Sequence, residues 1–248
     1  MMPESDPGVL LVDKPAGKTS FAMVRAVRKA CGIKKVGHAG TLDPFATGLL
    51  VICIGRPATR LVGELMDGCK EYLATMVLGK VSTTLDPEGE ISAGGPVSRI
   101  TTEQIEAALE PFRGNIMQTP PQYSAVKHKG KPLYHYARKG EYVEKAPRAV
   151  RIHTLEWQRS ESVDGNPIST LDLRIICSKG TYIRSLAADI GSTLGCGAYL
   201  STLRRTQSGF FNVSESVPGS ELYTENASNL VREYMIPVDE IQKSLQLS

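Results

Sequence analysis

Residues 37–48 concentrate chemically useful side chains in a short stretch that reads Gly-His-Ala-Gly-Thr-Leu-Asp-Pro-Phe-Ala-Thr-Gly. Asp43 precedes Pro44, and a residue before proline is pushed toward extended backbone geometry. We therefore expect the Asp43 carboxylate to project from a loop, where it could attack or deprotonate a substrate. An Asp-Pro pair is also typical of an ordinary turn. From composition alone, the turn is the favoured interpretation.

The elements that must position this segment follow from periodicity and turn signals. Strands are expected at 8–13, 49–54, 70–78, 151–160 and 168–177, with the last two forming a hairpin around a turn at 164–167. Helices are expected at 20–31, ended by Gly32, at 59–66, at 102–109 behind a Thr101/Gln104 capping box, and at 182–194. Strands and helices mix without regular alternation, which predicts an α+β fold on a mixed, largely antiparallel sheet.

Positive charge is unevenly placed, although the 248-residue chain carries a net charge of only +3. Residues 14–35 hold seven Lys or Arg and no acid, and residues 120–151 hold eight against two Glu, a net charge of +6. Four tyrosines lie among the charges of the second stretch and offer stacking surfaces. A charge run can be no more than a solvated face, but this combination favours a nucleic-acid-binding surface.

The sequence lacks the features that several classes of protein function require. The longest apolar run, 49–54, is far shorter than the roughly 20 residues of a membrane-spanning helix. Five widely spaced cysteines and four histidines form no ligand-spaced pair, so we expect reduced thiols, no metal and no cofactor. Gly17-Lys18-Thr19 lacks the earlier glycine of a nucleotide-binding loop, because Val12 occupies that position. The N-terminus shows no targeting pattern, so we expect a cytoplasmic protein.

Residues 37–48 resemble the catalytic motif of TruB-type pseudouridine synthases, Gly-His-x-Gly-x-Leu-Asp-Pro-x-Ala-Thr-Gly. Four further segments agree with that family in the same order, at residues 11–20, 70–72, 123–138 and 177–184. The similarity spans about residues 8–213. It implies a pseudouridine synthase fold and an enzyme that breaks the N1–C1′ bond of a uridine, turns the base and rejoins it through C5.

The resemblance assigns a role to each matching residue. Asp43 would be the catalytic carboxylate, acting by attack on the base, by attack on the sugar or by proton abstraction. Arg184 would pair with Asp43 and hold it ionised. Tyr182 would line the pocket. Because Tyr182 and Arg184 are two residues apart, we expect extended or turn geometry there, just before the helix.

The remaining assigned residues concern the RNA. Tyr72 would stack on the flipped uracil and His38 would occupy the space that the base leaves. Lys14 and Arg60 are assigned to substrate binding, and Arg60 stands where relatives often have lysine. Without the surrounding motif, Tyr72 would be an ordinary strand aromatic and His38 a loop histidine.

The basic stretch at 120–151 matches the family's RNA-gripping insertion, often called a thumb. Its candidate phosphate-binding residues are Lys127, Lys129, Lys131, Arg138 and Lys139. We expect a catalytic domain over 1–213 and a short acidic extension over 214–248 without a full PUA domain.

The expected activity is isomerisation of one uridine in the T-loop of tRNA, at tRNA position 55, by a monomer that recognises the folded loop. A tRNA-binding or folding module without catalysis is the alternative. A small-molecule nucleosidase is disfavoured, because it would not need the positive charge of the insertion.

Overall fold

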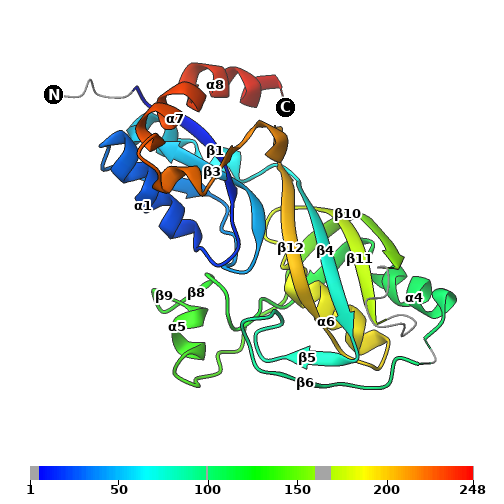
Figure 1. The fold of residues 1–248 in the computed structure, drawn as a ribbon. Coiled ribbons are helices and arrows are strands. Elements are labelled where there is room, and N and C mark those ends of the chain that lie inside the picture. The colour runs from blue at the N-terminus through cyan, green and yellow to red at the C-terminus, as the bar shows by residue number, and fades with distance from the viewer. Residues whose placement is uncertain (1–5, 99, 160–168, 248) are drawn as a thin grey trace. The chain divides into compact units, whose positions relative to one another are not determined.

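The computed structural model describes residues 6–98, 100–159 and 169–247. The chain forms two compact units, the first made of residues 1–72 and 203–248 and the second of residues 73–202. It leaves the first unit within strand β4 (Lys70–Leu78) and returns within β12 (Ala198–Ser208) (Figure 1). No helix in these described ranges is long and apolar enough to cross a membrane.

The first unit is built on β1 (Gly8–Lys14) and β3 (Thr47–Ile54), which pair antiparallel. Strand β1 also pairs with β14 (Val217–Pro218) in parallel and with β15 (Ile236–Pro237) antiparallel. Strand β3 pairs with β2 (Val36–Ala39) antiparallel and with β12 in parallel, and β13 (Phe211–Asn212) pairs with β12. Nearly every residue of β1 and β3 is buried. Continuous apolar runs such as these are typical of strands that are covered on both faces of the sheet.

Helices and short 3-10 turns cover this sheet. They are α1 (Ser20–Cys31), α2 (Gly55–Arg60), α3 (Val62–Leu65), η2 (Val213–Glu215), η3 (Glu221–Tyr223), α7 (Ala227–Tyr234) and α8 (Val238–Leu247). The predicted bounds of α1 are confirmed, with a Thr19 cap at its start and Gly32 at φ 72° at its end. The helix expected at 59–66 begins earlier, at Gly55, and is interrupted at Leu61.

The second unit carries the other end of the sheet, with neighbours in the order β12, β4, β11 (Thr170–Cys177), β10 (Arg148–Arg159) and β7 (Gly114–Gln118). The predicted pairing of β10 with β11 is confirmed as antiparallel. The turn expected at 164–167 lies outside the described residues. Buried and half-buried residues alternate along β11, the pattern of a strand with one face on a core.

Smaller elements complete the second unit. They are β5 (Lys80–Ser82), β6 (Ile91–Ala93), α4 (Thr102–Leu109), η1 (Glu110–Phe112) and α6 (Ile183–Thr193). The Thr101/Gln104 capping box is confirmed in both directions. With its mixed, largely antiparallel sheet and its helices, the protein has the α+β fold that the sequence predicts.

The glycine- and proline-rich segment at 113–148 is only partly an excursion from the sheet. The glycines and prolines of the segment predict that it lies outside the core sheet. Residues 114–118 instead form β7 and pair with β10, so this prediction is wrong for them. Beyond β7, the chain forms a hairpin of β8 (Lys127–His128) and β9 (Lys131–Pro132), followed by α5 (Leu133–Ala137). Strand β10 begins at Arg148, so the last residues of 120–151 also belong to the sheet.

None of the five cysteines, all of which lie in the described ranges, forms a disulfide bond, as the sequence indicates. Cys53, Cys177 and Cys196 are buried, whereas Cys69 is exposed. Burial raises the pKa of the Cys53 thiol to about 12, so this side chain stays protonated and packs as an apolar group.

Candidate active site

Asp43 lies in the loop between β2 and β3, where the sequence predicts it, and is half-buried. The loop is anchored on both sides of Asp43. The Ser20 hydroxyl donates to the Leu42 carbonyl over 3.0 Å and accepts from the Leu42 N–H over 2.9 Å. The Gly17 N–H donates to the Pro44 carbonyl over 2.8 Å. These bonds fix the backbone that carries the carboxylate.

Lys14, at the end of β1, is bonded to the same loop. Its side chain is fully buried, and its ammonium donates to the carbonyls of Pro44 at 3.1 Å, Pro15 at 2.9 Å and Lys18 at 2.6 Å. A buried ammonium requires such acceptors, because its desolvation is otherwise very costly. The structure thus gives Lys14 a clear role in positioning the loop, and its contact with RNA stays a prediction.

Arg205, in β12, is a further support that the sequence analysis missed. The residue is 1% exposed, and its guanidinium donates to the Leu49 carbonyl over 2.8 Å and to the Gly40 carbonyl over 3.1 Å. A Cβ on Gly48, whose φ is +97°, would overlap the Arg205 backbone, so glycine is required where β3 meets β12. Arg205 therefore ties the start of the Asp43 loop to the sheet.

His38 precedes the loop on β2 and is half-buried. Burial, and after it the positive charge of Arg205, lowers the pKa of His38 below its usual value. The imidazole is therefore neutral at physiological pH, which suits the space-filling role that the resemblance predicts for it.

Two other predicted residues lie in the first unit. Tyr72 is in β4 and is buried, with 9% of its surface exposed. Arg60 is the last residue of α2 and is exposed, so its guanidinium is available for a phosphate.

In the second unit, Tyr182 and Arg184 open helix α6. Tyr182 is the residue before the helix and has extended geometry, as predicted, whereas Arg184 is already helical. The Gln118 side chain, at the end of β7, bonds the Tyr182 backbone twice, accepting from its N–H at 2.7 Å and donating to its carbonyl at 3.0 Å. Gln118 thus fixes the residue that was predicted to line the pocket.

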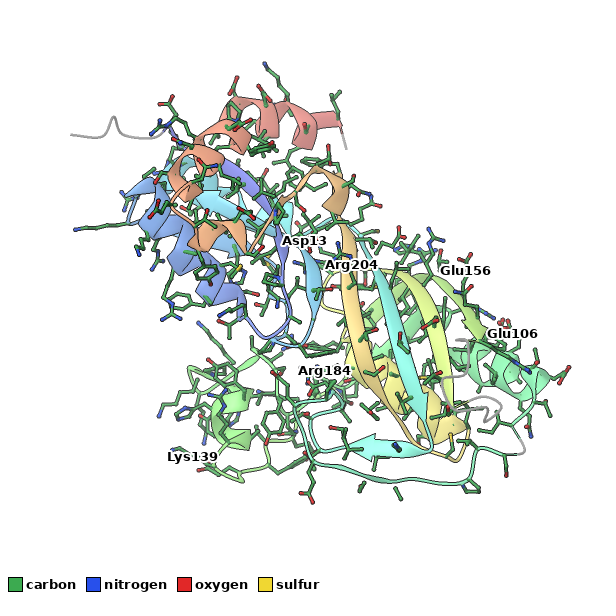
Figure 2. All side chains as sticks on the ribbon, viewed as in Figure 1. Asp13, Glu106, Lys139, Glu156, Arg184 and Arg204 are labelled. Carbon is green, nitrogen blue, oxygen red and sulfur yellow. The ribbon has the colours of Figure 1, made fainter. Side chains whose placement is uncertain are left out.

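Arg184 is buried and bonded to three parts of the second unit (Figure 2). Its guanidinium lies 3.1 Å from the Asp86 carboxylate and donates to the carbonyls of Thr84 and Tyr123, each over 2.7 Å. The Arg184 and Asp86 side chains are 3% and 4% exposed. In the sequence, Asp86 begins the turn pattern Asp-Pro-Glu-Gly and carries no signal of an ion pair. The pairing of Arg184 with Asp43, which belongs to the first unit, stays a prediction.

The insertion presents its cations to solvent. Lys127, Lys129, Lys131, Arg138 and Lys139 are all exposed, with Lys139 labelled beyond α5 in Figure 2. Gln122 joins the two ends of the insertion by a pair of hydrogen bonds with the Val143 backbone, at 3.0 and 3.1 Å. Exposed cations on a closed loop are suited to phosphate contacts.

Comparison with solved structures defines the class of the fold. The chain matches the crystal structure of a Cbf5-Nop10-Gar1 complex with a TM-score of 0.67 and 30% identity, over 94% of this chain and 60% of that one. It matches the archaeal box H/ACA Nop10-Cbf5 complex with a TM-score of 0.65 and 27% identity, over 96% and 61% of the two chains. In both cases the chain spans less than two thirds of the matched structure. The fold is that of the pseudouridine synthases.

Sequence comparison defines a narrower class than the fold does. Residues 28–183 match the model of the TruB family pseudouridylate synthase N-terminal domain, and residues 184–242 match the tRNA pseudouridylate synthase B C-terminal domain. The chain is 51% identical to tRNA pseudouridine synthase B of Desulfotalea psychrophila, over 96% of this chain and 97% of that protein. Identity to the Protochlamydia amoebophila protein of the same name is 48%, over 91% and 84%. The protein belongs to the TruB family of pseudouridylate synthases.

The first prediction concerns Arg205. Arg205→Met leaves the carbonyls of Gly40 and Leu49 buried without this donor, and each such loss costs about 1–3 kcal/mol. We expect the free energy of unfolding to fall by about 2–5 kcal/mol and kcat to fall at least tenfold, while Arg205→Lys is intermediate. Urea unfolding and single-turnover assays measure the two effects.

Arg204 supplies the matched control. It is the neighbouring arginine, is 40% exposed, and pairs with Asp13 at 2.7 Å (Figure 2). Arg204→Met is expected to lose no more than about 1 kcal/mol, as for other exposed pairs. Equal effects of the two substitutions would contradict the role given to Arg205.

A second prediction concerns the buried pair of Arg184 and Asp86. Removing one member of a buried pair costs about 3–5 kcal/mol, so we expect Asp86→Ala to lower the free energy of unfolding by that amount. The double variant Asp86→Ala/Arg184→Met should be less destabilised than the sum of the two single variants. The exposed pair of Arg174 and Glu156, with side chains 43% and 62% exposed, is the control and should show additive effects near zero.

A third prediction concerns pH. Since the folded protein holds the pKa of His38 below its unfolded value, protonation of His38 opposes folding, and stability falls as pH drops through and below about 6.5. His38→Gln should reduce this loss, as measured by Tm between pH 7.5 and 5. In Arg205→Met the His38 pKa, followed by NMR, should rise. A Tm difference between wild type and His38→Gln that does not change with pH would refute the assignment.

Proposed function

We propose that this protein converts one uridine of tRNA to pseudouridine, with Asp43 as the catalytic carboxylate. The observation that carries the proposal is the anchored loop, because Ser20, Gly17, Lys14 and Arg205 all bond the backbone around Asp43. Family membership and relatives named tRNA pseudouridine synthase B support the reaction and the substrate.

The target uridine is the one in the T-loop, at tRNA position 55. This base is stacked within the folded loop, so it must be extracted at a cost of a few kcal/mol. Stacking on an aromatic ring returns about 1–3 kcal/mol. Tyr72 supplies that ring, His38 fills the vacated space and Tyr182 closes the pocket. One well-placed tyrosine is sufficient in magnitude to offset much of the extraction cost.

Asp43 breaks the N1–C1′ bond, and the base turns and rejoins through C5. Arg184 pairs with Asp43 and keeps the carboxylate ionised. The reaction is an isomerisation, so atoms balance with no co-reactant. The side chains named here supply the groups it needs.

The RNA is held mainly by charge and shape. Arg60 and the five candidate cations of the insertion contact phosphates, Lys14 contributes to substrate binding by holding the Asp43 loop, and the folded T-loop supplies specificity. We further propose that the catalytic domain extends over 1–213, that 214–248 is an acidic extension, and that the enzyme acts as a cytoplasmic monomer.

The deciding experiment compares wild type with Asp43→Asn on an unmodified tRNA transcript. Product formation should fall by several orders of magnitude because the nucleophile or base is lost, while affinity for the transcript stays within a few-fold. Mass spectrometry of nuclease digests locates the modified position. Asp239→Asn, on the exposed face of α8, is the control and should retain full activity.

Two outcomes would overturn the proposal. An active Asp43→Asn variant would remove the proposed mechanism. Binding of the transcript by wild type without any product would instead identify a tRNA-binding or folding module. A transcript with cytidine at position 55 should give no product in either case.

A further inference from the structure

The outward face of α1 carries cations that the reaction does not use. Phe21, Arg25 and Lys29 are exposed and lie at successive intervals of four residues, so they share one side of the helix. The opposite side of α1 is buried in the first unit, through residues that include Met23, Val24 and Val27. We call the outward side, with Lys18, Arg28 and Tyr223, the α1 face.

Aromatic rings hold three of these cations, Lys18, Arg25 and Arg28, in place. The guanidinium carbons of Arg25 and Arg28 lie 5.6 and 5.7 Å from the centre of the Phe21 ring. The Lys18 ammonium lies 5.4 Å from the centre of the Tyr223 ring. Phe21 and Tyr223 are each 54% exposed, and Lys18 and Arg25 beside them are exposed as well. Arg28 is half-buried and donates to the Val36 carbonyl over 2.9 Å. Preordered cations bind an anion at a lower entropic cost than free side chains.

Helix stability explains only part of this charge. Arg28 and Lys29 lie in the last turn of α1, where cations favour the helix dipole. Lys18 lies just before the helix, at its positive end, and the first turn contains no acidic residue. The charge of Lys18 is therefore unfavourable for the isolated helix and becomes favourable when an anion binds beside it.

A recess of about 590 Å³ adjoins these cations, between α1 and the segment that contains η3 and the start of α7. Arg25 and Lys29 line it together with Tyr223, and Glu225 adds one carboxylate. Its floor is apolar and is formed by Ala22, Ala26, Ala30 and Leu222. A recess of this volume accommodates a nucleotide.

The α1 face starts beside the Asp43 loop. Ser20, the first residue of α1, is bonded to Leu42 in both directions, so the helix runs outward from the loop. The 12 residues of α1 correspond to about 18 Å of helix. An RNA strand whose target nucleotide lies at Asp43 can therefore continue along this face.

We propose that the α1 face binds the phosphate backbone of the tRNA outside the target loop, with Arg25 and Lys29 as the main phosphate contacts. This inference rests on the proposed function for the identity of its RNA. The face extends RNA binding beyond the insertion and adds a contact that depends on salt and not on sequence.

The test measures the salt dependence of binding. Arg25→Gln/Lys29→Gln and wild type are titrated with an unmodified tRNA transcript between about 50 and 200 mM salt. Loss of two phosphate contacts should reduce the slope of log K against log salt by about 1.5. The charge-retaining variant Arg25→Lys/Lys29→Arg should keep the wild-type slope, and circular dichroism shows that each variant is folded.

Arg232→Gln/Lys243→Gln is the matched control, because it removes two exposed charges from α7 and α8 of the same unit. It should leave the slope unchanged. An unchanged slope in Arg25→Gln/Lys29→Gln, or an equal loss in the control, overturns the inference. Pseudouridine formation by wild type is assayed separately, so a failure of the proposed function is distinguished from a failure of the α1 face.

Discussion

Buried cations bonded to backbone carbonyls fix the loop that carries Asp43. Lys14 binds the carbonyl of Pro44 on one side of the carboxylate, and Arg205 binds that of Gly40 on the other. Both side chains are almost completely buried, which is costly unless every charge finds acceptors. These buried cations lie beside the proposed catalytic carboxylate, where position matters. A displacement of a reacting group by 1 Å can lower the reaction rate by about two orders of magnitude. Stiffness of the loop backbone is thus the condition on which the proposed chemistry depends.

The second unit also contains a buried cation that is bonded to backbone carbonyls. Arg184 is held by the carbonyls of Thr84 and Tyr123 as well as by Asp86. A buried ion pair contributes little net stability, although breaking one is expensive. Its effect here is to define geometry, since it links the first turn of α6 to the base of the insertion at Tyr123.

Local signals predicted much of this fold. The bounds of β4 and α1 follow from apolar periodicity and, for α1, from a glycine in left-handed geometry at its end. Strand β7 was missed because Gly114 and Pro120 punctuate its surroundings, while its pairing with β10 is a long-range interaction that no local pattern records. The same reason applies to the site. Asp43 stands in a recognisable motif, whereas Arg205, Gln118 and Asp86 act through partners far along the chain and look like ordinary strand or turn residues in the sequence.

Burial separates the cations of this protein into two kinds that composition cannot distinguish. Lys14, Lys70, Arg184 and Arg205 are buried and donate to backbone carbonyls, so their charge serves the protein's own architecture. The five candidate cations of the insertion are exposed, as are Lys18, Arg25 and Lys29 of the α1 face, so their charge is available to a polyanion. A net charge of +3 conceals this division. Binding of RNA should therefore weaken steeply with salt, whereas the geometry around Asp43, which depends on buried groups, should be little affected.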